Sequence, residues 1–140
     1  MKYYFLSDAH LGARVISDAT AHQQKLIDWL DMAKQDADAI FLLGDIFDFW
    51  FEYRKTIPAG YARLLQKLKE LTQSGLPIHF FTGNHDIWTF GFLEKQIGLI
   101  IHKEPATIEL AGKRFFLAHG DGLGDKNFSF RFIRANADAE

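Results

Sequence analysis

Four hydrophobic runs, each followed directly by a polar motif, constrain the fold of this 140-residue chain more than any other feature. Residues 3–6, 39–43, 78–81 and 115–118 are mainly apolar and aromatic, which is typical of buried strands. The motifs that follow them are Asp8-Ala9-His10, Gly44-Asp45-Ile46-Phe47-Asp48, Gly83-Asn84-His85-Asp86 and His119-Gly120-Asp121-Gly122. Open α/β sheets place their sites at the carboxyl ends of strands, so we expect one polar site at one sheet edge.

The segments between these runs predict a β-α alternation in the first part of the chain. The expected helices run from Ser17 or Asp18 to about Gln35, from about Pro58 to Gly75, and from about Phe90 to Ile97. Short strands over 100–102, 107–110 and 114–118 then predict antiparallel pairing, with a hairpin turn at 111–113. Residues 126–134 are interpreted as the start of an amphipathic helix. The fold class is therefore α/β, with an α+β second part.

Composition narrows the function classes. The chain is 48% hydrophobic and 24% charged, which is ordinary for a globular domain. A net charge of −2 gives no basic field, so nucleic acid is not the default partner. Since there is no cysteine, any metal must be held by His, Asp, Asn or Glu. We find neither a secretory signal nor an apolar run of about 18 residues, and we expect a cytoplasmic protein.

Each motif alone has an ordinary structural explanation. Asp8 and His10 could cap a helix, Asn84 could form an Asx turn, and His119 could be a hydrogen-bonded core histidine. Their occurrence at four strand ends favours a common function. Carboxylates, an amide oxygen and imidazoles suit Mn²⁺, Fe²⁺ or Zn²⁺. Five such ligands exceed one tetrahedral site, which indicates a two-metal arrangement with Asp45 as the bridging ligand.

The order of these motifs resembles the calcineurin-like metallophosphoesterase superfamily, over Lys2 to about Gly124. The resemblance implies an α/β/β/α sandwich and two divalent metal ions, with Mn²⁺ as the first expectation. It implies that Asp8, His10 and Asp45 bind the first metal. It further implies that Asp45, Asn84 and His119 bind the second, with His85 and Asp86 as catalytic candidates and His85 close to the leaving group.

Within the superfamily, residues 44–53, 81–86 and 118–124 resemble the UDP-2,3-diacylglucosamine hydrolases. This implies cleavage of a diphosphate in lipid A synthesis, giving lipid X and UMP. The candidate substrate contacts are Asn84, Phe49, Trp50 and Arg131. For the aromatic stretch after Asp48, ordinary core packing is an equal alternative. Other readings of the chain are a phosphoesterase with a different substrate and a metal-binding module without activity.

The resemblance also implies a downstream Gly-x-His or Gly-His-x-His segment, which these 140 residues do not contain. We therefore expect residues 1–124 to be the N-terminal part of a metallophosphoesterase domain. Residues 125–140 would be the start of a cap or insert, or a truncated tail. An incomplete sandwich would expose a sheet edge, so self-association is expected. A substrate with acyl chains would bring the protein to the inner face of the inner membrane.

Overall fold

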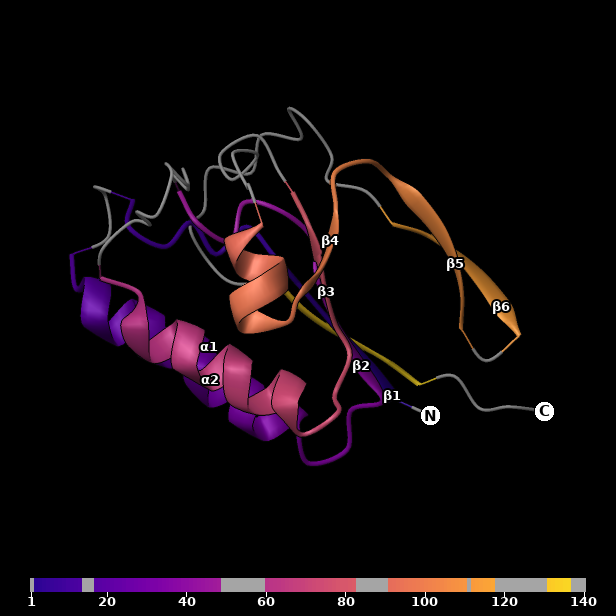
Figure 1. Ribbon diagram of the computed structural model, residues 1–140, viewed down its shortest axis with the longest axis horizontal. Coiled ribbons are helices and arrows are strands. Elements are labelled where there is room, and N and C mark those ends of the chain that lie inside the picture. The colour runs from indigo at the N-terminus through magenta and orange to yellow at the C-terminus, as the bar shows by residue number, and fades with distance from the viewer. Residues whose placement is uncertain are drawn as a thin grey trace.

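The computed structural model describes residues 2–13, 17–48, 60–82, 91–110, 112–117 and 131–136, the last of these as backbone only. Figure 1 shows the chain as a central sheet with helices on one side and a β-hairpin on the other.

The central sheet has five strands in the order β4-β3-β2-β1-β7. Its strands are β1 (Lys2–Ser7), β2 (Ala39–Leu42), β3 (Ile78–Phe81), β4 (Ile100–His102) and β7 (Arg131–Asn136). The first four are mutually parallel, and β7 pairs antiparallel with β1. The carboxyl ends of β1, β2 and β3 therefore lie at the same edge of the sheet, as predicted. The expectation for the fourth apolar run was wrong, because residues 113–117 pair antiparallel with residues 106–110 in a separate two-stranded sheet.

Helices α1 (Ala19–Ala33), α2 (Ala62–Gln73) and the short π-helix η1 (Leu93–Ile97) cover one face of this sheet. The side chain of Asp18 accepts a hydrogen bond from the Ala21 amide and caps α1, as the sequence predicts. The predicted apolar stripes of both long helices are buried: Leu26, Trp29, Leu30 and Ala33 on α1, and Leu64, Leu65, Leu68 and Leu71 on α2. The helix layer is thus packed by amphipathic faces.

A two-stranded antiparallel hairpin, β5 (Ala106–Leu110) and β6 (Lys113–Leu117), covers part of the opposite face. Leu110 and Leu117 pack in one cluster with Tyr3, Phe5 and Phe41 of the sheet. Helices, sheet and hairpin form three successive layers (Figure 1). This mixed α/β architecture agrees with the fold class inferred from the sequence.

Three details of the secondary structure differ from the sequence-based expectation. Strand β4 pairs in parallel with β3, because η1 forms a crossover that returns the chain in the same direction. Residues 131–136 form β7 where a helix was expected, since the free edge of β1 offers a full ladder of backbone partners. Helix α2 begins at Ala62, later than the start expected at Pro58.

None of the helices in the described part of the chain has the length and apolar character needed to cross a bilayer.

Aromatic rings line the sheet face that lies opposite the helices. Phe41, on the central strand β2, is fully buried and stacks on Phe5 at 5.0 Å and on His79 at 4.7 Å between ring centroids. Beyond His79, His102 stacks on Phe81 at 4.3 Å. The row therefore crosses the sheet from β1 to β4 and ties the four parallel strands together by side-chain contact.

Two histidines in this row are joined by a hydrogen bond. Nδ1 of His79 and Nε2 of His102 are 2.9 Å apart, so one nitrogen donates and the other accepts. Burial, followed by the charge of His102, lowers the pKa of His79 below its usual 6.5. Burial likewise lowers the pKa of His102. The fold therefore favours the pair in its neutral form.

We expect this pair to make folding sensitive to acid. Because both pKa values are lower in the folded chain, the unfolded chain takes up protons first as the pH falls below about 6.5. The free energy of unfolding should therefore decrease between pH 7.5 and pH 5.5. Urea unfolding at both pH values should show a smaller decrease in the double variant His79→Phe/His102→Phe. An equal decrease in the two proteins would contradict the assignment to this pair.

Candidate metal centre

The segments that follow β1 and β2 are joined by backbone hydrogen bonds. These bonds continue the parallel ladder past the ends of both strands. They run from Asp8 N–H to Gly44 C=O (3.1 Å), from His10 N–H to Asp45 C=O (2.9 Å) and from Leu11 N–H to Ile46 C=O (2.9 Å). The two polar motifs are therefore fixed to one another before any side chain is considered.

Asp8, His10 and Asp45 share an unusual backbone conformation. Their φ angles are 58°, 46° and 49°, and no other non-glycine residue in the described ranges has a positive φ. The left-handed region costs a non-glycine residue about 1–3 kcal/mol and persists where the surrounding structure enforces it. Gly44, which directly precedes Asp45, has φ 90° and provides the tight strand exit expected of it. Backbone strain is thus concentrated on the three predicted ligands of the first metal.

The side chains of these three residues converge. Nε2 of His10 lies 3.6 Å from Oδ1 of Asp8 and 3.8 Å from Oδ2 of Asp45. One ligand atom from each residue can be chosen so that all three lie within 4.8 Å of one another. Asp45 is only 6% exposed, and among the described residues it is the one charged side chain that is buried. Charged groups that are buried in this way are usually paired or bound to metal.

Asp48 fixes the orientation of the His10 ring. Nδ1 of His10 lies 3.3 Å from Oδ1 of Asp48, and since a carboxylate only accepts, the proton of the neutral ring is on Nδ1. Nε2 is then left with a lone pair directed towards Asp8 and Asp45. A carboxylate behind a histidine is the usual support of a metal-ligating imidazole. The sequence placed Asp48 in the motif but did not reveal this role.

Tyr61, the N-cap residue of α2, contacts the loop that follows β1 and carries Asp8 and His10. Its hydroxyl donates to the Leu11 carbonyl at 3.1 Å, and its ring contacts Phe47 edge-on at 4.9 Å between centroids. Burial, with a smaller contribution from the charge of Asp48, raises the pKa of Tyr61 above 10. The phenol is therefore a neutral donor that holds the first ligand loop in place.

The three residues fit a divalent metal ion. Two carboxylates and an imidazole with a free Nε2 form a donor set of intermediate hardness, suited to Mn²⁺, Fe²⁺ or Zn²⁺. Strained backbone, convergent ligand atoms and the support from Asp48 together describe a candidate site for one divalent ion.

The described residues do not place the other predicted site residues at the Asp8–His10–Asp45 cluster. Asn84, His85, Asp86, His119, Phe49 and Trp50 lie outside the described residues. Arg131 begins β7 and pairs in register with Ser7, directly before Asp8, so its backbone is at the same end of the sheet. Their proposed roles stay predictions.

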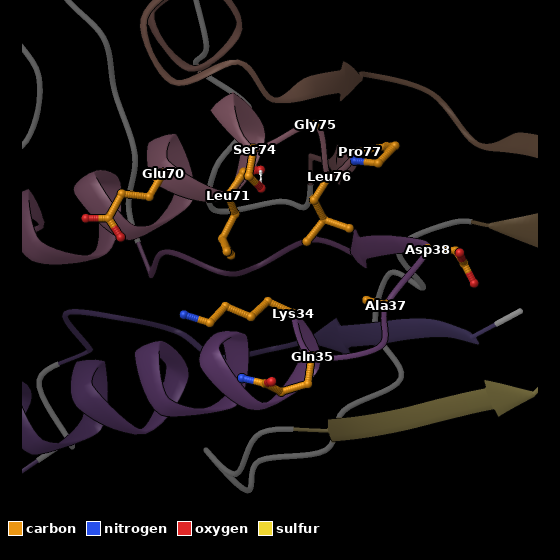
Figure 2. A pocket seen from close by; sticks show the side chains of 10 residues that line it. All are labelled: Lys34, Gln35, Ala37, Asp38, Glu70, Leu71, Ser74, Gly75, Leu76 and Pro77. Carbon is orange, nitrogen blue, oxygen red and sulfur yellow. Dashed lines mark hydrogen bonds between the residues drawn. The ribbon is translucent and has the colours of Figure 1, made fainter.

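A hollow of about 670 Å³ lies at the opposite end of the sheet and is separate from this cluster. Figure 2 shows Lys34 and Gln35 on one side, and Leu71, Ser74 and Leu76 on the other. These residues lie at the carboxyl ends of α1 and α2 and before β3, where the parallel strands begin. The hollow therefore takes no part in the chemistry of Asp8, His10 and Asp45.

Comparison with known proteins agrees with this geometry. The family model for calcineurin-like phosphoesterases matches residues 1–138. A UDP-2,3-diacylglucosamine hydrolase of Porphyromonas gingivalis is 48% identical over 120 residues, which are 86% of this chain and 46% of the relative. The enzyme of the same name from Nitrosococcus oceani is 32% identical, covering 96% of this chain and 52% of the relative. The chain thus spans about half the length of these curated relatives.

Among solved structures, the Escherichia coli phosphoesterase Yfce superposes with a TM-score of 0.51 over 91% of this chain and 62% of that protein, at 22% identity. At this identity the similarity concerns the fold. Together with the family match over nearly all residues and the converging Asp-His-Asp cluster, it leads to one assignment. The chain belongs to the calcineurin-like phosphoesterase family.

Proposed function

We propose that this chain contributes to a metal-dependent hydrolase that cleaves the diphosphate of UDP-2,3-diacylglucosamine, releasing lipid X and UMP. The observation that carries the proposal is the convergence of Asp8, His10 and Asp45 at one sheet edge. The substrate is suggested by relatives that bear this name and are 48% and 32% identical. Family membership makes the reaction a hydrolysis at phosphorus.

Asp8, His10 and Asp45 would hold the first metal ion, with Asp48 keeping the His10 ring in its ligating tautomer. We propose Mn²⁺ as that ion, with Zn²⁺ and Fe²⁺ as alternatives. When bound, a divalent ion supplies positive charge that polarises the phosphoryl group and activates water. Asn84 and His119 are proposed for the second ion, and His85 with Asp86 for protonation or charge stabilisation at the leaving group.

The proposed substrate also suggests where the protein works. A diacylated sugar nucleotide resides at a membrane surface through its acyl chains, so we propose a cytoplasmic protein that visits the inner face of the membrane. Phe49, Trp50 and Arg131 are proposed to contact this substrate. Self-association, expected from the sequence, can be tested by gel filtration at high protein concentration.

The proposal is tested by measuring Mn²⁺ binding and turnover on the same preparation. We expect titration calorimetry to detect Mn²⁺ binding. UMP release from UDP-2,3-diacylglucosamine should be faster than hydrolysis of bis-p-nitrophenyl phosphate, a generic phosphodiester, and EDTA should abolish both. Faster cleavage of the generic ester would favour a phosphoesterase with a different substrate. Metal binding without turnover at high enzyme concentration would favour a binding module, and no metal binding would refute the proposal.

A further inference from the structure

His22 contacts the backbone between two of the candidate metal ligands. It lies in the first turn of α1, where its own amide donates to the Asp18 carbonyl at 3.0 Å. Its Nε2 is 2.6 Å from the carbonyl oxygen of Ala9, which is a fully buried residue. Since a carbonyl only accepts, Nε2 carries the proton and donates. The first turn of the helix is thereby tied to the loop that carries Asp8 and His10.

This hydrogen bond acts on one particular peptide group. The peptide that joins Ala9 to His10 is held at its C=O by His22 and at its N–H by the Asp45 carbonyl, at 2.9 Å. Rotation of that peptide plane would change ψ of Ala9 and φ of His10 together. The φ of His10 is 46°, in a region that non-glycine residues leave readily when it is not enforced. Holding both ends of the peptide therefore stabilises the strained conformation.

We propose that His22 is a positioning residue of the metal centre. By holding the Ala9–His10 peptide, it keeps His10 in the left-handed conformation in which Nε2 is directed at Asp8 and Asp45. Asp48 acts on the ring of His10, whereas His22 acts on its backbone. This inference rests on the proposed function, because it assumes that the cluster binds a metal ion.

A simpler role for His22 is that of a tether between α1 and the loop. A tether would contribute to folding as a typical hydrogen bond does, so its loss would lower the melting temperature, and it would leave the metal affinity of the folded chain unchanged. A positioning residue would instead alter metal affinity, because hydrogen-bonded supports of metal ligands typically contribute about 10–100-fold to binding. Metal affinity measured alongside thermal stability therefore separates the two roles.

The test compares four proteins by Mn²⁺ titration calorimetry and by electron paramagnetic resonance of bound Mn²⁺. His22→Leu removes the donor and should weaken binding about 10–100-fold. His22→Gln places an amide N–H near the position of Nε2 and should restore most of the affinity. Gln24→Leu is the matched control, because Gln24 lies on the same helix as His22 and its described hydrogen bonds go to Asp28 of α1 and Arg63 of α2, not to the Ala9 loop. Its affinity should equal that of the unmodified chain.

Equal Mn²⁺ affinity in His22→Leu and the unmodified chain, with a lower melting temperature, would reduce His22 to a tether and overturn the proposal. If His22→Leu does not fold, His22→Asn replaces it, because its shorter amide cannot reach the Ala9 carbonyl. Equal affinities of the Asn and Gln variants would then overturn the proposal. Failure of the unmodified chain to bind Mn²⁺ would instead refute the proposed function, and the positioning role with it.

Discussion

Replacing Asp45 by asparagine should weaken Mn²⁺ binding by at least about 100-fold, more than the loss of a supporting residue costs. Asp45 is the buried carboxylate of the cluster and the proposed shared ligand of two metal ions. Asparagine keeps the shape of the side chain and tolerates the left-handed φ of 49° that this position adopts. The loss should therefore reflect the missing negative charge. Calorimetry and Mn²⁺ resonance measure the affinity and stoichiometry, and UMP release measures the activity.

A control variant and a stability measurement separate the loss of a metal ligand at Asp45 from other effects of the substitution. The control is Asp28→Asn, which should bind Mn²⁺ normally. Asp28 is an exposed residue of α1, and among its described hydrogen bonds its carboxylate accepts one, from Gln24. The metal-free Asp45→Asn protein should melt no lower than the unmodified chain, because one of two neighbouring like charges has been removed. Unchanged metal stoichiometry in Asp45→Asn would exclude Asp45 as a bridging ligand.

Asp8, His10 and Asp45 could be identified from the sequence because a simple rule places them. Parallel strands end at one edge, and each of these residues follows the end of a predicted strand. Applying this rule requires only the positions of the strands in the sequence. Those positions can be predicted from uninterrupted apolar runs such as residues 39–43.

The supporting residues could not be found in this way. Asp48 and His22 act through partners that are 38 and 13 residues away in sequence, so their roles depend on how the loops and α1 are placed. The left-handed backbone of Asp8, His10 and Asp45 likewise results from the hydrogen bonds between the two loops. An Asp or a His in a motif does not by itself indicate such a conformation.

Residues 131–136, for which a helix was expected, show that a local sequence pattern does not always determine secondary structure. Its sequence, Arg-Phe-Ile-Arg-Ala-Asn, is compatible with an amphipathic helix and with a strand. The structure selects the strand, since β1 offers an unpaired edge that accepts the whole segment in register from Lys2↔Asn136 to Ser7↔Arg131. A tertiary partner that is more than 120 residues away in sequence decides the secondary structure here.

Phe41→Ala should have the largest effect on stability, about 3–5 kcal/mol, as expected for a buried phenylalanine. Phe41 is fully buried on the central strand β2 and stacks on both Phe5 and His79. Urea unfolding followed by circular dichroism measures the cost. Phe116→Ala is the matched control, because that ring is 71% exposed and its loss should change stability by less than about 0.5 kcal/mol. Similar costs in the two variants would contradict the packing described for this face.

Phe41→Ala and Asp45→Asn should also differ in how much added metal stabilises them. Phe41→Ala leaves Asp8, His10 and Asp45 in place, so Mn²⁺ at 100 times its dissociation constant should return about 2.7 kcal/mol of stability by mass action. Asp45→Asn keeps the core but lacks the ligand, and because its dissociation constant should be at least about 100-fold higher, the same Mn²⁺ concentration should return no more than about 0.4 kcal/mol. Rescue of both variants by Mn²⁺ would indicate that the metal binds elsewhere. Rescue of Phe41→Ala alone would link metal binding to the cluster at the ends of β1 and β2.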